Sequence, residues 1–165
     1  MILGGASFGR DEGDINETAD LNNPNFTFRR GVRANDVPRM AKASGLYELP
    51  YGVSLSAAAQ YFTGFPEQTT VSVSRDTVAL TQVTQSLLVA PAGTTRLPSV
   101  TMFDMSLKKI FRLGAQRSIE PVLDIFNLGN VSTVTRRTAQ LGPSYGRVSN
   151  IVRGRMMKLG LNVKF

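Results

Sequence analysis

Apolar and polar residues alternate along the end of the chain, residues 155–165. Alternation with a period of two places one set of side chains on each face of a β-strand. The segment also has the length of one tilted bilayer crossing and ends on an aromatic residue. It therefore predicts the closing strand of an outer-membrane β-barrel, with an amphipathic strand of a soluble sandwich as the alternative. The set predicted to face lipid is Met157, Leu159, Leu161, Val163 and Phe165.

Residues 2–8, 37–48, 53–61, 99–112 and 118–127 have the composition of further strands. Residues 53–61 alternate most clearly, with mainly apolar side chains on one face and small or polar ones on the other. Residues 37–48 alternate weakly, so the pattern does not assign their lipid and lumen faces. Pro121 weakens the segment 118–127, because proline cannot donate to a strand ladder.

Long and short connections alternate between these segments. Residues 49–52 and 112–117 form short turns, whereas residues 9–36, 63–98 and 128–150 are long and have loop composition. The Thr- and Val-rich middle of residues 63–98 is compatible with a local hairpin. Bacterial barrels have short periplasmic turns and long extracellular loops. The sequence thus predicts an all-β antiparallel up-and-down meander of about six strands, a partial transmembrane β-barrel with a periplasmic C-terminus.

Aromatic residues gather at both ends of the predicted strands. Two aromatic belts separated by aliphatic residues are typical of the two interfaces of a bilayer. A sandwich with aromatic residues near its strand ends is the alternative. Tyr47, Tyr51, Phe111 and Phe165 lie at the short-turn end, and Tyr61, Phe62, Phe103 and Phe126 lie at the long-loop end.

Composition removes several classes of function. Cys and His are both absent, which excludes disulfides, thiolate metal sites and the commonest general base. No stretch of about 18 apolar residues predicts a membrane helix. The start of the chain does not resemble a signal peptide, so an export signal would lie outside this sequence. The net charge is +7, but the basic residues are scattered and no recognition helix carries them, so nucleic acid is not an expected partner.

Charged residues on the proposed lumen face predict structural pairing. A turn centred on Gly114 would place Lys108 opposite Glu120, and opposite charges across strands stabilise sheets. The sequence contains no nucleophile–base pair, phosphate loop or metal-spaced cluster, so neither an enzyme nor a cofactor is predicted. The residues assigned to this pairing are Lys108, Glu120, Asp124 and Lys158.

Arginine residues concentrate in and near the last predicted outer loop. Arg136, Arg137 and Arg147 lie within it, and Arg153 and Arg155 lie where the last strand would meet the outer interface. Arginine binds phosphate well, so lipopolysaccharide phosphates are a candidate partner. A solvated basic loop is the alternative.

Short motifs run along most of the chain and resemble those of a known family. The most specific is Asp124-Ile-Phe-Asn-Leu-Gly-Asn130, and the others are Asp36-Val-Pro38, Tyr47-Glu-Leu-Pro-Tyr-Gly52, Gly64-Phe-Pro66, Asp104 with Lys108-Lys109, and Arg155 to Phe165. Together they resemble the C-terminal barrel of TonB-dependent outer-membrane receptors, particularly Oar-like receptors with a carboxypeptidase-regulatory-like domain. The family often has His-Arg after Asp-Val-Pro, whereas only Arg39 is present here.

The resemblance implies a barrel of about 22 strands filled by a plug domain, so the chain is expected to be a fragment or a truncated product. Residues 1–165 would then form part of the wall of a bacterial outer-membrane transporter, whose ligand class (siderophore, carbohydrate or peptide) is not resolved. Implied partners are membrane lipid, lipopolysaccharide and, through the last strand, the barrel-assembly machinery; TonB and the plug enter only through upstream sequence. Two alternatives remain, a small anchor or adhesion barrel and a soluble β-sandwich binding module.

Overall fold

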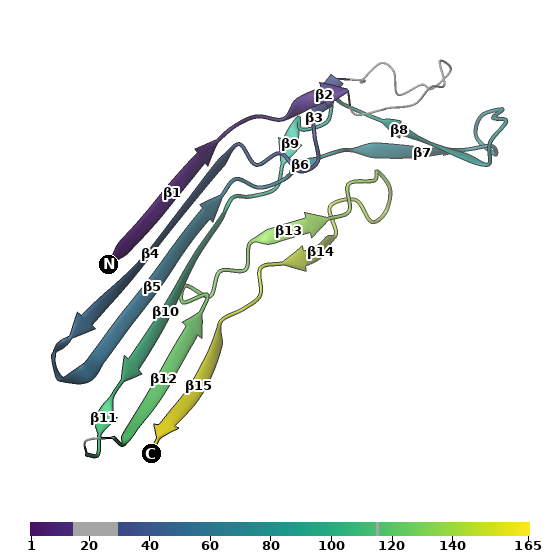
Figure 1. Ribbon diagram of the computed structural model, residues 1–165. Helices are drawn as coiled ribbons and strands as arrows, with labels where there is room; N and C mark the ends of the chain where they lie inside the picture. The colour runs from purple at the N-terminus through teal and green to yellow at the C-terminus, as the bar shows by residue number, and fades with distance from the viewer. Residues whose placement is uncertain (15–29, 115) are drawn as a thin grey trace.

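The computed structural model describes residues 1–14, 30–114 and 116–165, and the main element in these ranges is one antiparallel sheet (Figure 1). The strands follow one another in space as they do in sequence, in the order β1-β4-β5-β10-β12-β15, while β11 continues β10 beside the start of β12. The predicted all-β antiparallel meander is therefore confirmed. Its strands are β1 (Ile2–Phe8), β4 (Arg39–Leu49), β5 (Val53–Phe62), β10 (Val100–Lys109), β11 (Phe111–Arg112), β12 (Ser118–Phe126) and β15 (Met156–Lys164).

The long connections carry small two-stranded sheets beyond one end of the main sheet (Figure 1). The hairpin in residues 63–98 is present as β7 and β8. Strand pairing within residues 9–36 and 128–150 was not predicted, because these segments lack a period-two pattern. The pairs are β2 (Glu12–Asp14) with β3 (Arg30–Val32), β6 (Pro66–Glu67) with β9 (Thr95–Arg96), β7 (Thr70–Ser74) with β8 (Thr84–Leu88), and β13 (Val134–Arg137) with β14 (Val148–Ile151).

The short turn between β4 and β5 is a 3-10 turn, η2 (Pro50–Gly52). Tyr51 and Gly52 both have positive φ, of 64° and 74°. A side chain at Gly52 would also lie 3.1 Å from the carbonyl oxygen of Ile110. Glycine is required here because it alone adopts this conformation without steric cost and permits the close approach.

Pro121 marks an interruption in the sheet. The ladder from β12 to β15 continues through Pro121, which lies opposite Leu161. On the other side, pairing with β10 ends at Lys108 and resumes with β11 at Phe111. The gap falls opposite Pro121, as expected for a residue without an N–H group.

The predicted opposition of Lys108 and Glu120 is wrong. Lys108 lies opposite Val122, while Glu120 lies opposite Asn162 on β15 and 3.5 Å from the ammonium group of Lys164. The pairing of β10 with β12 is symmetric about a point one residue after Gly114. Each β10 residue therefore pairs with a β12 residue two positions later than predicted. A shift of two preserves the face of each side chain, so the alternation could not reveal it.

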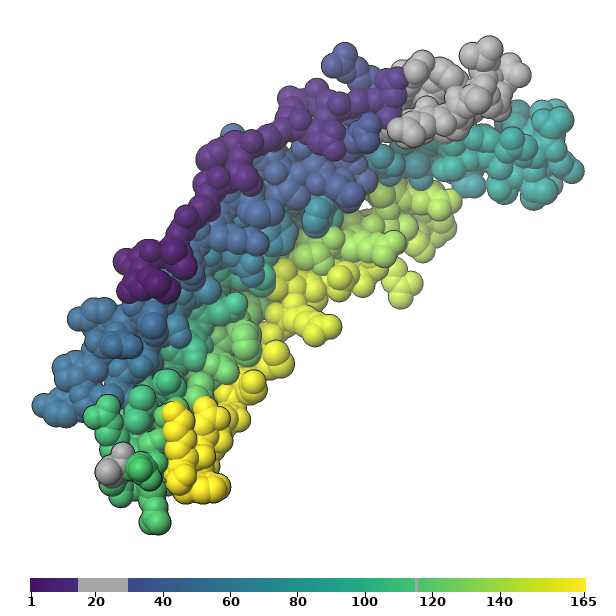
Figure 2. All heavy atoms as spheres, in the orientation of Figure 1, coloured from purple at the N-terminus to yellow at the C-terminus, as the bar shows by residue number. Residues whose placement is uncertain are grey.

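Neither face of the main sheet is covered by a second layer among the described residues. The buried apolar side chains in this part of the chain are few, namely Val32, Pro66, Ala92, Val100 and Ile125. The accessible surface is 11711 Å², against roughly 8,000 Å² for a compact monomer of 17.9 kDa. Figure 2 shows the resulting elongated form, with β1 along one side and β15 along the other. The fold is a single curved sheet with two open edges.

Asn127 joins three strands at the long-loop end of the sheet. It has a φ of 53° and is buried. Its backbone N–H donates to Asp104 Oδ1 at 2.8 Å, and Nδ2 donates to the carbonyl oxygens of Val131 and Arg153 at 2.8 and 2.7 Å. Oδ1 accepts from the N–H of Val131 at 2.9 Å. This one amide therefore anchors the Asp-Ile-Phe-Asn motif between β10, β12 and the segment leading to β15.

Replacing Asn127 with Asp should destabilise the folded protein by about 1–3 kcal/mol. Aspartate keeps the acceptor for Val131 but loses both donated bonds, which leaves the carbonyl groups of Val131 and Arg153 without this donor beside a new negative charge. Asn130→Asp is the matched control, because Asn130 Oδ1 is only seen to accept, from the N–H of Arg155 at 2.9 Å. Urea unfolding should separate the two variants, and equal losses of unfolding free energy would contradict this account.

Candidate functional site

One face of the main sheet is apolar from β4 to β15. A single row of paired residues crosses it, and every member is apolar: Tyr47, Leu55, Leu107, Leu123 and Leu159. The terminal-strand residues predicted to face lipid lie on this face and are exposed, from 51% at Val163 to 95% at Phe165. They are not covered by any other described part of the chain. Exposed apolar patches of this extent mark an interaction with something other than water.

Aromatic residues border this apolar face in two lines. At the long-loop end, Tyr61 lies opposite Thr101, two residues before Phe103. Tyr61 also lies opposite Ala41 on β4, and Ala41 lies opposite Ala6 on β1. Ala6 is two residues before Phe8. Phe8 therefore extends the line onto β1, a position that the sequence pattern missed. Phe62 and Phe126 lie near the same end but on the opposite, polar face, because each follows an apolar-face residue directly.

At the short-turn end, the line begins at Tyr47 on β4. The row of paired residues that contains Tyr47 also contains Leu107 on β10, which is four residues before Phe111. Phe111 lies opposite Ile119 on β12, and Ile119 lies opposite Val163 on β15. Val163 is two residues before Phe165. Tyr51, in the turn after β4, is 90% exposed at the same end. The girdle residues predicted from sequence, Tyr47, Tyr51, Phe111, Tyr61 and Phe103, thus lie at the two ends expected of them.

The opposite face is polar and lined with small side chains. Lys158 lies opposite Asp124, whose Oδ1 accepts from Ser106 Oγ at 2.6 Å. Lys108 and Glu120 lie on this face too, but each has a different neighbour, as described above. The four residues predicted to pair do share one face, and the positions of Lys158 and Asp124 permit pairing. The contacts seen for these groups are the ion pair of Glu120 with Lys164 and the hydrogen bond from Ser106 to Asp124.

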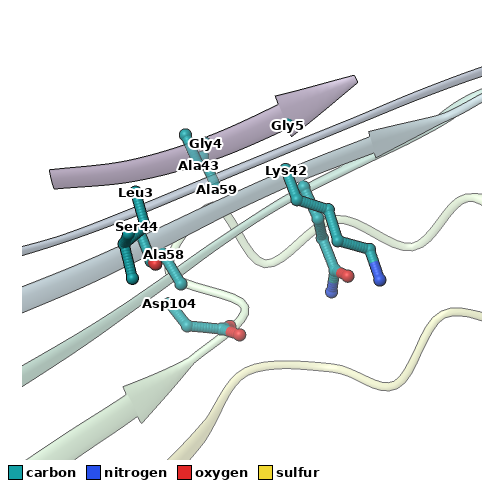
Figure 3. A pocket seen from close by; sticks show the side chains of 10 residues that line it. Leu3, Gly4, Gly5, Lys42, Ala43, Ser44, Ala58, Ala59 and Asp104 are labelled. Carbon is teal, nitrogen blue, oxygen red and sulfur yellow. The ribbon is translucent and has the colours of Figure 1, made fainter. Parts of the chain in front are cut away.

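Small residues leave shallow hollows on the polar face. Figure 3 shows one of about 350 Å³, into which the side chains of Lys42 and Asp104 project, with Ser44 and Ala58 at its floor. A second, of about 300 Å³, shares Ser44, Ala58 and Asp104. The carboxylate of Asp104 already accepts the backbone N–H of Asn127. Both hollows are lined by a mixture of apolar and polar residues.

The first and second long connections are joined by a buried ion pair. Arg96 Nη2 donates to Asp36 Oδ2, and Asp36 Oδ1 accepts the backbone N–H of Asp11 at 2.6 Å. Burial alone would raise the pKa of Asp36, but the Asp11 amide and the Arg96 guanidinium outweigh it and hold that pKa below its ordinary value of 3.8. Close backbone packing supports the junction, since the N–H of Val32 donates to the carbonyl of Ala92 at 3.0 Å.

The second and third long connections are joined in the same way. Arg137 Nε donates to Glu67 Oε1 at 2.6 Å, and its Nη2 donates to Oε2, so the pair is bidentate. These bonds to Glu67 raise the pKa of the Arg137 guanidinium. Thr70 bonds through its backbone to Ala139 and Leu141 at 3.3 and 2.7 Å. The guanidinium of Arg137 is therefore already paired with Glu67, which corrects the assignment of Arg137 as an outer-surface anion contact.

The remaining arginines differ in what they contact. Arg155 Nη2 donates to the carbonyl of Leu128 at 2.6 Å. Arg136 and Arg147 are exposed, and neither forms an ion pair with a described carboxylate. These two remain available for an anion. Sequence reasoning missed Asp36, Glu67 and Arg96, because no local spacing links them to their partners.

Acidification should loosen the junction between the first two connections. Because the pKa of Asp36 is depressed, its stabilising effect is complete above about 3.8 and is lost as pH falls through the lower folded value. The amide of Asp11 should therefore lose its protection from hydrogen exchange below that pH. Asp36→Asn should abolish this step, and a step that persisted in the variant would assign it to another group.

Arg137→Lys should weaken the junction between the second and third connections by about 1 kcal/mol, since lysine cannot form the bidentate pair. Limited proteolysis within residues 138–147 should become faster. Arg147→Lys is the matched control, because Arg147 makes no described ion pair. Equal cleavage rates in both variants would show that the Glu67 pair does not hold the junction.

No helix among the described residues is long and apolar enough to cross a membrane. The same residues contain no group of three or more carboxylates that could hold a metal ion. Comparison of the chain with protein-family models, curated proteins and solved structures finds no match.

Proposed function

We propose that this chain forms part of the wall of an outer-membrane β-barrel of the TonB-dependent receptor kind. Its apolar face would contact lipid and its polar face would line the lumen. The observation that carries the proposal is the pair of aromatic lines bordering the apolar face. They run obliquely across the strands and parallel to each other.

The slope of both lines fits the strand tilt of a barrel. From Phe8 to Phe103 the aromatic line at the long-loop end moves four residues toward the short turns, over the three steps between neighbouring strands from β1 to β10. From Tyr47 to Phe165 the aromatic line at the short-turn end moves six residues in the same direction, over the four steps between neighbouring strands from β4 to β15. With about 3.3 Å per residue and about 4.8 Å between strands, both slopes correspond to a tilt of roughly 45°. Membrane barrels have strands tilted by about 35–45°.

The separation of the lines also fits a bilayer. Phe103 and Phe111 are eight residues apart on one continuous strand path. This is roughly 27 Å along the strand and about 20 Å after correction for the tilt. The aromatic side chains extend beyond the strand positions that carry them and add to that height. The sum approaches the height of the apolar band in such barrels, about 25 Å. Aromatic residues at the ends of a sandwich have no reason to follow a common oblique line.

The open edges support a larger assembly. β1 and β15 each leave one edge without a partner in the described chain, and a membrane tolerates no such edge in lipid. Because the strands alternate in direction, β1 and β15 are antiparallel, so further antiparallel strands would continue the sheet from either side. A soluble sandwich would instead need a second sheet over the apolar face, and the described residues supply none.

In this role the chain is structural. It would insert through the barrel-assembly machinery, using the last strand, and contact lipid and lipopolysaccharide in the outer membrane. A plug and a TonB contact would have to come from sequence outside residues 1–165. A smaller anchoring or adhesion barrel would use the same wall, and a plug-like domain encoded upstream would exclude it.

Leu161→Arg tests the proposal, because Leu161 lies near the middle of the apolar band on β15. It is 64% exposed, so in water the change should be nearly neutral. In lipid, arginine at the midplane should cost about 2–4 kcal/mol. The fraction of protein that associates with phosphatidylcholine vesicles, measured by flotation, should fall sharply.

Asn162→Arg is the matched control, since the neighbouring side chain lies on the polar face. It should associate with vesicles as well as the parent protein does. If Leu161→Arg associated equally well, or if the parent were a stable monomer in buffer without detergent, the membrane proposal would be wrong.

A further inference from the structure

A hollow of about 330 Å³ lies between the second and third long connections. Its walls come from the segment around β6 and from β13, which the Glu67–Arg137 pair holds together. Figure 1 shows both elements beyond the end of the main sheet, away from its apolar band. The volume is at the lower end of the range of about 300–1,000 Å³ for small-molecule sites. The hollow is thus large enough for a ligand of one or two small rings.

The charge of the hollow favours an anion. Glu67 is the only acidic residue among the described residues of its lining, and its carboxylate is neutralised by the bidentate bonds from Arg137. Arg136 also lines the hollow and has no ion pair with a described residue. One guanidinium is therefore available to bind a carboxylate, sulfate or phosphate through paired hydrogen bonds.

The neutral groups favour a ligand rich in hydroxyl groups. Thr135 Oγ1 is buried and has no hydrogen-bond partner among the described residues. The amides of Asn35 and Gln68 line the same hollow, and the ring of Phe65 is 38% exposed beside them. A few polar groups around an apolar surface are typical of a site that orients a small ligand. A buried hydroxyl group without a partner is costly, and a ligand oxygen would remove that cost.

We infer that this hollow binds an anionic saccharide, with Arg136 on its acidic group and Thr135 on a hydroxyl group. The site is built by the connections alone and does not depend on the membrane placement proposed above. Its walls are fixed before binding by the Glu67–Arg137 pair, which limits the loss of conformational entropy on binding. The saccharide could be free or part of a lipopolysaccharide core, since both present the same chemistry.

The test is calorimetric titration of the detergent-refolded protein with a galacturonate disaccharide and with the neutral galactose disaccharide of the same linkage. The acidic sugar should bind at least about tenfold more tightly. Arg136→Gln should remove this preference, because it deletes the charge-assisted bonds. Arg147→Gln, in the same hairpin but outside the lining of the hollow, should leave the affinity unchanged.

Thr135→Val separates a binding role from a structural one. Removing a hydroxyl group that has no protein partner should leave the thermal midpoint unchanged or higher, while affinity falls about fivefold. Equal binding of the two sugars, or unchanged affinity in Arg136→Gln, would overturn the inference. Displacement of the bound sugar by detergent-dispersed lipopolysaccharide would support the site and identify the membrane's own saccharide as its source; binding that resists displacement would support a free one.

Discussion

The apolar face of the main sheet imposes the constraint on which the rest of the structure depends. A row of large apolar side chains from Tyr47 to Leu159 crosses the sheet and meets no covering layer among the described residues. Burying such a surface is the dominant favourable term in folding. A sheet that does not bury it within its own chain needs an apolar environment, and lipid satisfies that need without a second layer.

The same constraint explains how strain and polarity are distributed. The ladder breaks at Pro121, and the turn η2 with its positive φ angles lies at the same, short-turn end of the sheet. At the other end, the buried amide of Asn127 satisfies the carbonyl groups left where the ladder stops. The positive φ of Asn127 is accommodated because asparagine tolerates the left-handed region better than most residues.

Beyond the sheet, ion pairs act beside a small apolar contact. Val32 and Ala92 are buried where the first two connections meet, and Asp36–Arg96 and Glu67–Arg137 join the three connections in sequence. Both carboxylates are largely removed from water and are bonded by guanidinium groups, the geometry in which ion pairs are strongest. The hollow beside Glu67 exists because these pairs hold two loops at a fixed distance. The wall of the sheet and the site in the connections are therefore built by different forces.

Alternation of side chains was enough to determine most strands of the main sheet and their faces, because a period of two is a property of the local backbone. It left the faces of residues 37–48 unassigned, and the order of the meander came from the lengths of the connections. Alternation placed Met157 to Phe165 on one face and Asp124 with Lys158 on the other. It could not determine the register of Lys108, since a shift of two residues changes no face. Nor could it find the pairs of Asp36 with Arg96 or Glu67 with Arg137, which are 60 and 70 residues apart in sequence. Among 19 basic and 12 acidic residues, only the packing of the connections selects these partners, because ion pairing has no sequence period.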